Sequence, residues 1–126
     1  TDLRKTKFVL FGVAYKDGIG DTRNSPTEAI IKKFKRSNYD FEIIDPYVDK
    51  YKGKKTFNSI SHINLKDINI FVFCTSHIEF QKIRFDTFEP ENSYYIFDTN
   101  NCLIQSQLNQ IKKQNFYIQK TGDGTI

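Results

Sequence analysis

The segment between residues 15 and 28 gathers side chains whose types and spacing suit an anion. Lys16 and Arg23 are cations, and the run Ser25-Pro26-Thr27-Glu28 predicts a helix start with a Ser N-cap, a first-turn proline and a capping box. The free N–H groups and the positive dipole end of such a helix favour a phosphate or pyrophosphate. A second interpretation pairs Arg23 with Asp21 or Asp17 and leaves the helix start to its capping box.

The glycines near this segment do not form a dinucleotide-binding fingerprint. A G-x-G-x-x-G motif stands tightly between strand and helix, whereas Gly12 is followed by a long excursion. Gly18-Ile19-Gly20 is then continued by Arg23 where a third glycine would stand. The sequence therefore predicts an anion site that is not an NAD-binding turn.

The two cysteines do not follow a metal-binding pattern. Cys74 and Cys102 are far apart and lack metal-ligand spacing, so we expect buried, reduced thiols and no metal. The sequence leaves a disulfide between them open.

The elements that must position these residues alternate between strands and helices. Strands are expected at 7–14, 40–45, 68–75, 94–98 and 116–118. Helices are expected at 25–37, 80–84 and 103–113, with a Lys-rich loop at 47–55, an edge strand at 56–58 and a weak turn at 59–65. This alternation predicts an α/β fold with a Rossmann-like, doubly wound and mainly parallel sheet. The loops at 15–24, 46–52, 76–79 and 99–102 should line a crevice beyond the carboxyl ends of the strands.

Length and composition limit the chain to one domain, residues 1–126. This length excludes an enzyme that carries separate cofactor and substrate lobes. Hydrophobic residues make up 38% of the chain, which is enough for a core and argues against intrinsic disorder. The chain begins with Thr1 and contains no Met, so we expect a piece of something longer or a processed chain.

Charge and hydropathy indicate neither a nucleic-acid partner nor a membrane partner. The net charge of +4 is a mild excess spread over the whole length, and the basic clusters at 32–36 and 50–55 are interpreted as solvated surface. No apolar run approaches the ~18 residues that a membrane span needs, and the sequence shows no signal-peptide pattern of a basic start, an apolar stretch and a small-residue cleavage site. We therefore expect a soluble, cytoplasmic protein.

Five short motifs follow one another along the chain: Gly12–Lys16 (G-x-A-Y-K), Asp21–Pro26 (D-T-R-N-S-P), Ile44–Val48 (I-D-P-Y-V), Thr75–Phe80 (T-x-H-x-x-F) and Phe97–Asn101 (F-D-T-N-N). In this order they resemble the C-terminal, UDP-binding domain of the UDP-glucose/GDP-mannose dehydrogenase family. The resemblance covers essentially the whole chain. The histidine of the fourth motif is more similar to the branch that acts on UDP-N-acetylhexosamines.

The resemblance implies the substrate lobe of an NAD-dependent UDP-sugar 6-dehydrogenase. Such enzymes oxidise the sugar C6 alcohol to a carboxylate, with a Cys nucleophile that precedes this domain, so Cys74 and Cys102 do not inherit its role. NAD would be bound mainly by an N-terminal domain, and the partners would be the UDP-sugar and the remaining domains of a homo-oligomeric parent. That parent would serve cytoplasmic, bacterial polysaccharide-precursor synthesis, while this region alone would be inactive.

The resemblance also assigns substrate-binding residues. It places Tyr15 and Lys16 against the nucleotide sugar, and Asp21 and Arg23 in the same loop, either at the ligand or as an internal ion pair. His77 either hydrogen-bonds the substrate or stabilises its own loop.

Asn100 departs from the family pattern, which has an arginine at this position. An asparagine can hydrogen-bond but supplies neither the charge nor the bidentate fork of arginine. Either the activity is altered, or Arg23 or a neighbouring Lys compensates, or the parent has diverged. The other function class left open is a stand-alone regulatory module that binds a nucleotide or a simple phosphoanion without catalysis.

Overall fold

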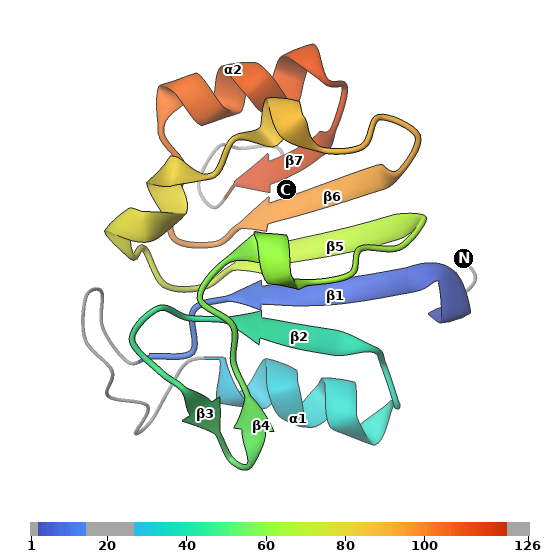
Figure 1. The fold of residues 1–126 in the computed structure, drawn as a ribbon, viewed down its shortest axis with the longest axis vertical. Coiled ribbons are helices and arrows are strands. Elements are labelled where there is room, and N and C mark those ends of the chain that lie inside the picture. Colours follow the sequence, from blue (N-terminus) through green and yellow to red (C-terminus); the bar gives the residue numbers. More distant parts are fainter. Residues whose placement is uncertain (1–2, 15–26, 121–126) are drawn as a thin grey trace.

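The computed structural model describes residues 3–14 and 27–120, which form a five-stranded sheet with helices on both faces (Figure 1). The strands are β1 (Thr6–Phe11), β2 (Phe41–Ile44), β5 (Ile68–Phe73), β6 (Ser93–Asp98) and β7 (Tyr117–Lys120). Their order across the sheet is β2-β1-β5-β6-β7, and every neighbouring pair is parallel. The predicted α/β class and doubly wound sheet are confirmed.

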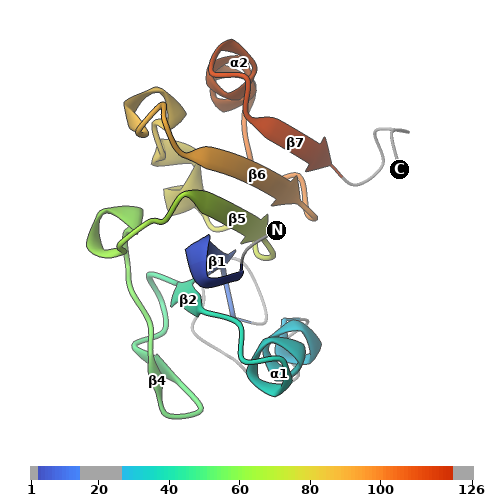
Figure 2. The ribbon, with the colours of Figure 1, turned by 90° about the vertical axis from the view of Figure 1, so that its right-hand side faces the viewer.

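Two α-helices lie on opposite sides of this sheet: α1 (Glu28–Arg36) beside β1 and β2, and α2 (Gln105–Lys113) beside β6 and β7 (Figure 2). Four 3-10 helices complete the connections: η1 (Leu3–Lys5), η2 (Ile60–His62), η3 (Ile78–Lys82) and η4 (Phe85–Thr87). The segment with η3 and η4 connects β5 to β6 on the α2 side (Figure 1). Of these four, η1 and η4 fall outside the elements that the sequence predicts.

Both α-helices end in the same way, at an asparagine with a left-handed backbone. Asn38 follows α1 with φ +56°, and Asn115 follows α2 with φ +60°. The next backbone N–H then reaches back to the last turn, from Tyr39 to the carbonyl of Phe34 at 3.0 Å and from Phe116 to that of Ile111 at 3.1 Å. Asparagine tolerates this conformation, so it closes both helices as glycine often does.

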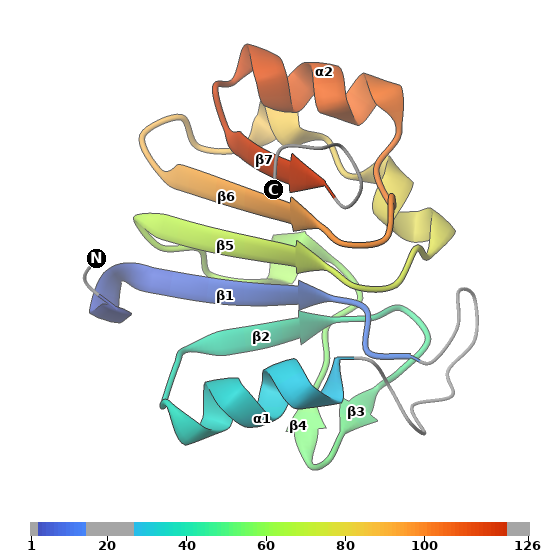
Figure 3. The same ribbon diagram turned by 180° about the vertical axis from the view of Figure 1, so that it is seen from behind.

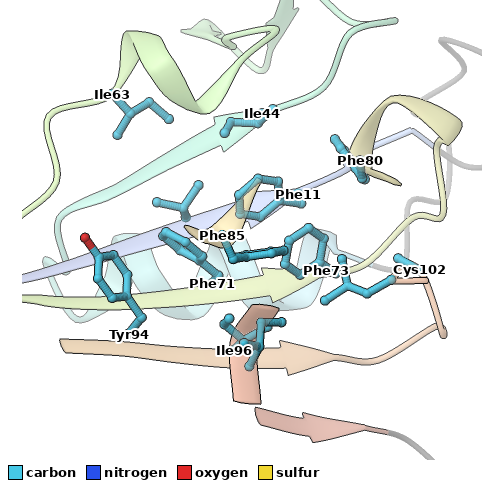
Figure 4. Packing of buried hydrophobic residues seen from close by; sticks show 13 residues of the cluster. Phe11, Ile44, Ile63, Phe71, Phe73, Phe80, Phe85, Tyr94, Ile96 and Cys102 are labelled. Atoms are coloured by element: carbon cyan, nitrogen blue, oxygen red, sulfur yellow. The ribbon is translucent and has the colours of Figure 1, made fainter. Parts of the chain in front are cut away.

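The larger cluster of buried apolar residues lies between the sheet and the helices α2, η3 and η4. Its centre is a group of phenylalanines in contact, with Phe11 stacked on Phe73 at 4.1 Å and edge-on to Phe80 at 5.5 Å between ring centroids (Figure 4). Alternate strand residues such as Leu10 point instead to a second cluster under α1. Because both faces of β1 are buried, its sequence is a continuous apolar run.

Two local predictions are wrong. The Lys-rich segment expected as a loop contains a hairpin, β3 (Lys50–Tyr51) and β4 (Lys54–Lys55), turned at two positive-φ residues, Lys52 and Gly53. The edge strand expected at 56–58 is a single bridge between Phe57 and Ile44. The described residues contain no helix that is long and apolar enough to span a membrane.

The capping box expected at the start of α1 stays a prediction. Ser25 and Pro26 lie outside the described residues, and the helix begins at Glu28 after Thr27, whose side chain makes no capping hydrogen bond. Glu28 is thus the first helical residue, and its carboxylate accepts from Lys52 at 2.5 Å. Glu28 therefore joins the start of α1 to the turn of the β3–β4 hairpin.

Candidate functional site

The candidate site lies at the carboxyl edge of the sheet, where the direction of the chain through the sheet reverses. From β1 the chain moves to β2 on one side, and it then returns to place β5 on the other side of β1 (Figure 1). In open α/β sheets ligands bind at this switch point, outside the carboxyl ends of the strands. The segments after β1, β2 and β5 meet there.

Gly12 brings the ends of β1 and β5 together. Its φ is +103°, and a Cβ at this position would lie 2.5 Å from the Thr75 Cβ and 2.9 Å from the Thr75 backbone nitrogen. The Thr75 hydroxyl donates to the carbonyl of Ala14 at 3.2 Å. Only glycine fits both the backbone conformation and the space at this crossing.

Asp45 binds all three segments to one another. One carboxylate oxygen accepts the backbone N–H groups of Val13 at 2.8 Å and Ala14 at 3.0 Å, and the other accepts that of Tyr47 at 2.9 Å. The His77 Nε2 atom lies 3.2 Å from the carboxylate, and both side chains are buried. Burial by itself would raise the pKa of Asp45, but the hydrogen bonds from His77 and the backbone N–H groups outweigh it and lower that pKa.

His77 is enclosed by its neighbours. Its ring centroid lies 4.7 Å from that of Tyr47 and 5.4 Å from that of Phe80, and none of its surface is exposed. The contacts described are those of a histidine that stabilises its loop, the second of the two predicted roles. A hydrogen bond from His77 to a substrate stays a prediction.

Tyr47 and Glu79 extend this group toward the surface. The Tyr47 hydroxyl donates to one Glu79 carboxylate oxygen at 2.6 Å, which raises the pKa of Tyr47 and lowers that of Glu79. The other oxygen of Glu79 is buried and has no hydrogen-bond partner within the described part of the chain. Glu79 also lines a hollow of about 230 Å³ between η2 and η3. An ionised carboxylate accepts but does not donate, so this hollow suits ligand groups that carry O–H or N–H.

The end of β6 forms the other half of the edge. Asp98 is buried and accepts the backbone N–H groups of Cys102 at 2.8 Å and Leu103 at 3.0 Å. Asn100 is exposed, and its amide nitrogen lies 3.5 Å from the Ser76 hydroxyl. Asn100 and His77, two of the predicted site residues, therefore lie on adjoining loops.

The remaining predicted site residues, Tyr15, Lys16, Asp21 and Arg23, lie outside the described residues. Sequence reasoning assigned none of the residues that hold the edge together to the site, although they lie within the quoted motifs: Gly12, Asp45, Tyr47, Thr75 and Glu79. An available signal was an acidic residue at the end of a strand or directly after it, as at Asp98 and Asp45.

Neither cysteine is placed as a nucleophile. Both are free thiols, Cys102 buried and Cys74 partly so, and burial raises the pKa of Cys74 to about 12. Among residues 3–14 and 27–120, no three His, Cys, Asp or Glu side chains are grouped to hold a metal ion.

Comparison with known proteins places this edge within a matched domain. Residues 9–105 match the model of the UDP-glucose/GDP-mannose dehydrogenase family, UDP binding domain. UDP-N-acetyl-D-mannosamine dehydrogenase of Methanococcus aeolicus is 28% identical over 124 residues, which cover 94% of this chain and 26% of that protein. The enzyme of the same name from Methanococcus vannielii is 28% identical over 127 residues, covering 98% of this chain and 28% of its own length.

A solved structure shares the fold. That of UDP-D-ManNAc dehydrogenase from Pyrococcus horikoshii superposes with a TM-score of 0.72 at 24% identity, over 97% of this chain and 27% of the other. The chain thus spans about a quarter of the length of the curated relatives that it matches. Because the family model covers most of its residues, the chain belongs to the UDP-glucose/GDP-mannose dehydrogenase family and corresponds to its UDP-binding domain.

Proposed function

We propose that this chain binds the UDP part of a nucleotide sugar, as the substrate lobe of an NAD-dependent UDP-sugar 6-dehydrogenase. The observation that carries the proposal is the family match over residues 9–105, a range that includes the whole carboxyl edge from Gly12 to Asn100. The relatives named UDP-N-acetyl-D-mannosamine dehydrogenase favour the N-acetylhexosamine branch. In this function the sugar C6 alcohol becomes a carboxylate, for cytoplasmic synthesis of polysaccharide precursors by a homo-oligomeric enzyme.

The carboxyl edge supplies two kinds of contact for such a ligand. Glu79 lines the hollow, and its carboxylate would accept hydrogen bonds from the hydroxyl and N–H groups of a nucleotide sugar but would repel its diphosphate. The diphosphate therefore needs cations, and Lys16 and Arg23 are the residues we assign to it.

NAD does not fit the described strand-to-helix connection of this chain. A dinucleotide site needs a tight glycine-rich turn that leads directly into a helix. Here Gly12 packs against Thr75, the next two residues are bound by Asp45, and α1 begins only at Glu28. We therefore assign NAD, the hydride acceptor of the reaction, to another part of the dehydrogenase.

Calorimetric titration of the chain with UDP, a UDP-N-acetylhexosamine and inorganic phosphate tests the proposal. We expect binding that requires the uridine, since a uridine-specific pocket distinguishes UDP from phosphate. Binding explained by phosphate alone would instead support the regulatory module that binds a simple phosphoanion.

Lys16→Ala sharpens this test. Loss of the proposed diphosphate contact should weaken UDP binding about tenfold or more, without a change in the melting temperature. Lys35→Ala is the matched control, because Lys35 is exposed on α1 and remote in sequence from the predicted loop. Equal UDP affinities of both variants and the wild type would remove Lys16 from the site.

A further inference from the structure

The half of the sheet formed by β5, β6 and β7 carries an apolar strip on the side where α1 lies. Two cross-strand rows form it: Ile70, Tyr95 and Tyr117 are in register, and Val72 and Phe97 lie in register one row closer to the carboxyl edge, where the polar Gln119 of β7 completes the row. Tyr95 is 42% exposed and Tyr117 is 48% exposed, whereas Ile70, Val72 and Phe97 are half-buried. We call these five residues the β5–β7 strip.

The strip differs from the rest of the sheet because no described helix covers it. On the opposite face, α2, η3 and η4 pack over the aromatic core. On the strip's own face, α1 buries Ile31 and Phe34 against β1 and β2. Figure 3 looks onto this face and shows β5 and β6 uncrossed by any described helix, and Figure 2 shows α1 displaced toward β2. Parallel sheets are normally covered on both faces, so the described residues leave the strip without its usual cover.

The aromatic side chains of the strip contact one another and form a continuous surface. The Tyr117 ring lies 5.9 Å from those of Tyr95 and Phe97, between centroids. Val72 also packs against the cluster under α1, so the strip continues that cluster. None of the five side chains carries a charge at neutral pH, which indicates an apolar partner surface.

The size of the strip fits one helix. Three adjacent strands span two inter-strand spacings, about 10 Å, and the two rows lie two residues apart, about 7 Å along the strands. A helix is about 10 Å in diameter. The same strip offers only about 70 Å² in projection, far below the ~800 Å² per partner of a stable dimer. A single helix beside α1 is thus favoured over a second copy of the chain.

We propose that the β5–β7 strip is the docking surface for an amphipathic helix from the part of the dehydrogenase polypeptide that lies outside these 126 residues. The inference rests on the proposed function, in which this domain works within a longer enzyme. The curated relatives have about three quarters of their length outside the matched region, which is ample chain to supply that helix. Docking there would fix the UDP-binding edge relative to the NAD-binding part of the enzyme.

Hydroxyl-radical footprinting read by mass spectrometry tests the proposal on two samples, the 126-residue chain and the longer dehydrogenase polypeptide. We expect oxidation of Tyr95 and Tyr117 to fall several-fold in the longer polypeptide. Ile104 is the internal control, because it is 41% exposed and precedes α2 on the opposite side of the sheet. Its oxidation should stay unchanged.

Two results would overturn the proposal. The first is equal oxidation of Tyr95 and Tyr117 in both samples. The second is protection that already develops in the short chain as its concentration rises, which would assign the strip to a second copy. UDP-sugar oxidation is measured on the same longer polypeptide. If that polypeptide is active while Tyr95 and Tyr117 are oxidised as in the short chain, the docking proposal is refuted and the proposed function is not. A protected strip without UDP binding refutes the proposed function instead.

Tyr95→Ser separates docking from folding. Because Tyr95 is exposed in the short chain, this variant should leave the melting temperature of that chain nearly unchanged. In the longer polypeptide it should increase proteolysis between the domains. Tyr39→Ser is the contrasting variant, since Tyr39 stacks on Phe8 at 5.0 Å within the short chain and should destabilise both samples. Equal proteolysis of the wild type and Tyr95→Ser would contradict the docking.

Discussion

Asp45 and Asp98 both follow or end a buried strand at the same edge of the sheet, yet they bind different partners. Asp98 accepts backbone N–H groups from four and five positions later in its own loop. Asp45 accepts N–H groups from Val13 and Ala14, more than thirty residues earlier, together with the His77 ring. The same residue type thus shapes one turn at β6 but joins three chain segments at the switch point. Long-range contacts of Asp45 thus hold the β1–β2–β5 half of the edge together. The β6 half leaves Asn100 exposed.

Replacement of the two aspartates by alanine tests this difference directly. Each buried N–H left without an acceptor costs about 1–3 kcal/mol. We expect Asp98→Ala, with two such groups, to lower the free energy of unfolding by about 3 kcal/mol. Asp45→Ala leaves three N–H groups and His77 without their acceptor, so the free energy of unfolding should fall by about 5 kcal/mol. Urea denaturation measures both values.

His77→Gln covers the case in which Asp45→Ala does not fold. It removes one contact of the group while the three backbone N–H bonds to Asp45 remain, and a loss of about 1–2 kcal/mol is expected. Equal losses for Asp45→Ala and Asp98→Ala would show that the long-range contacts of Asp45 add nothing.

Gly12→Ala tests whether the Asp45 half is also the more tightly packed. Gly53→Ala is the matched control, because both glycines have positive φ but a Cβ on Gly53 would meet nothing within 4 Å. The control should lose about 1 kcal/mol for the backbone conformation alone. Gly12→Ala adds the clash with Thr75 and should lose about 3 kcal/mol in total, by the same urea denaturation. A difference near zero would mean that β1 and β5 move apart at little cost.

The sequence predicts the elements of this edge much better than its contacts. The strands that end at Phe11 and Ile44 are largely buried on both faces, and the strand that ends at Phe73 is buried on one face and half-buried on the other, so their largely apolar runs are readable without a structure. The contact between Gly12 and Thr75 depends on the pairing of strands some sixty residues apart, which no local pattern encodes. Asp45 is visible as an acid after a strand, but its partners are set by the same long-range pairing.

Contacts between separate elements are a second limit on prediction from sequence. The carboxylate of Glu28 binds Lys52 on the β3–β4 hairpin, and no local spacing predicts this pair. That hairpin was itself missed, because two-residue strands of lysine and tyrosine show no alternation of apolar and polar residues. Ion pairs between separate elements therefore limit what the spacing of residues can predict.

Asn100→Arg probes the open half of the edge. The exposed side chain contributes little to folding, so the free energy of unfolding should change by less than about 0.5 kcal/mol. If the β6 loop faces the diphosphate, the added guanidinium should strengthen UDP binding by up to about tenfold, in titrations at moderate salt. Asn109→Arg on the exposed face of α2 is the charge control and should leave affinity unchanged. Equal effects of both substitutions would indicate general charge attraction and not a contact at Asn100.

The smallest expected effect is the pH dependence that Asp45 adds. Burial alone would raise its pKa, but the hydrogen bonds from His77 and the backbone N–H groups lower it in the folded protein. The pKa of an aspartate in an unfolded chain is about 3.9. The stabilisation by Asp45 is therefore complete above that pH, and it is lost as the pH falls toward the lower pKa of the folded protein. The free energy of unfolding of the wild type should therefore decline more steeply below about pH 4 than that of Asp45→Asn, which has no proton to gain there. Parallel pH profiles would mean that the pKa of Asp45 is the same in the folded and unfolded states. The proposed role of the charged Asp45 side chain in joining the three segments at the switch point would then be wrong.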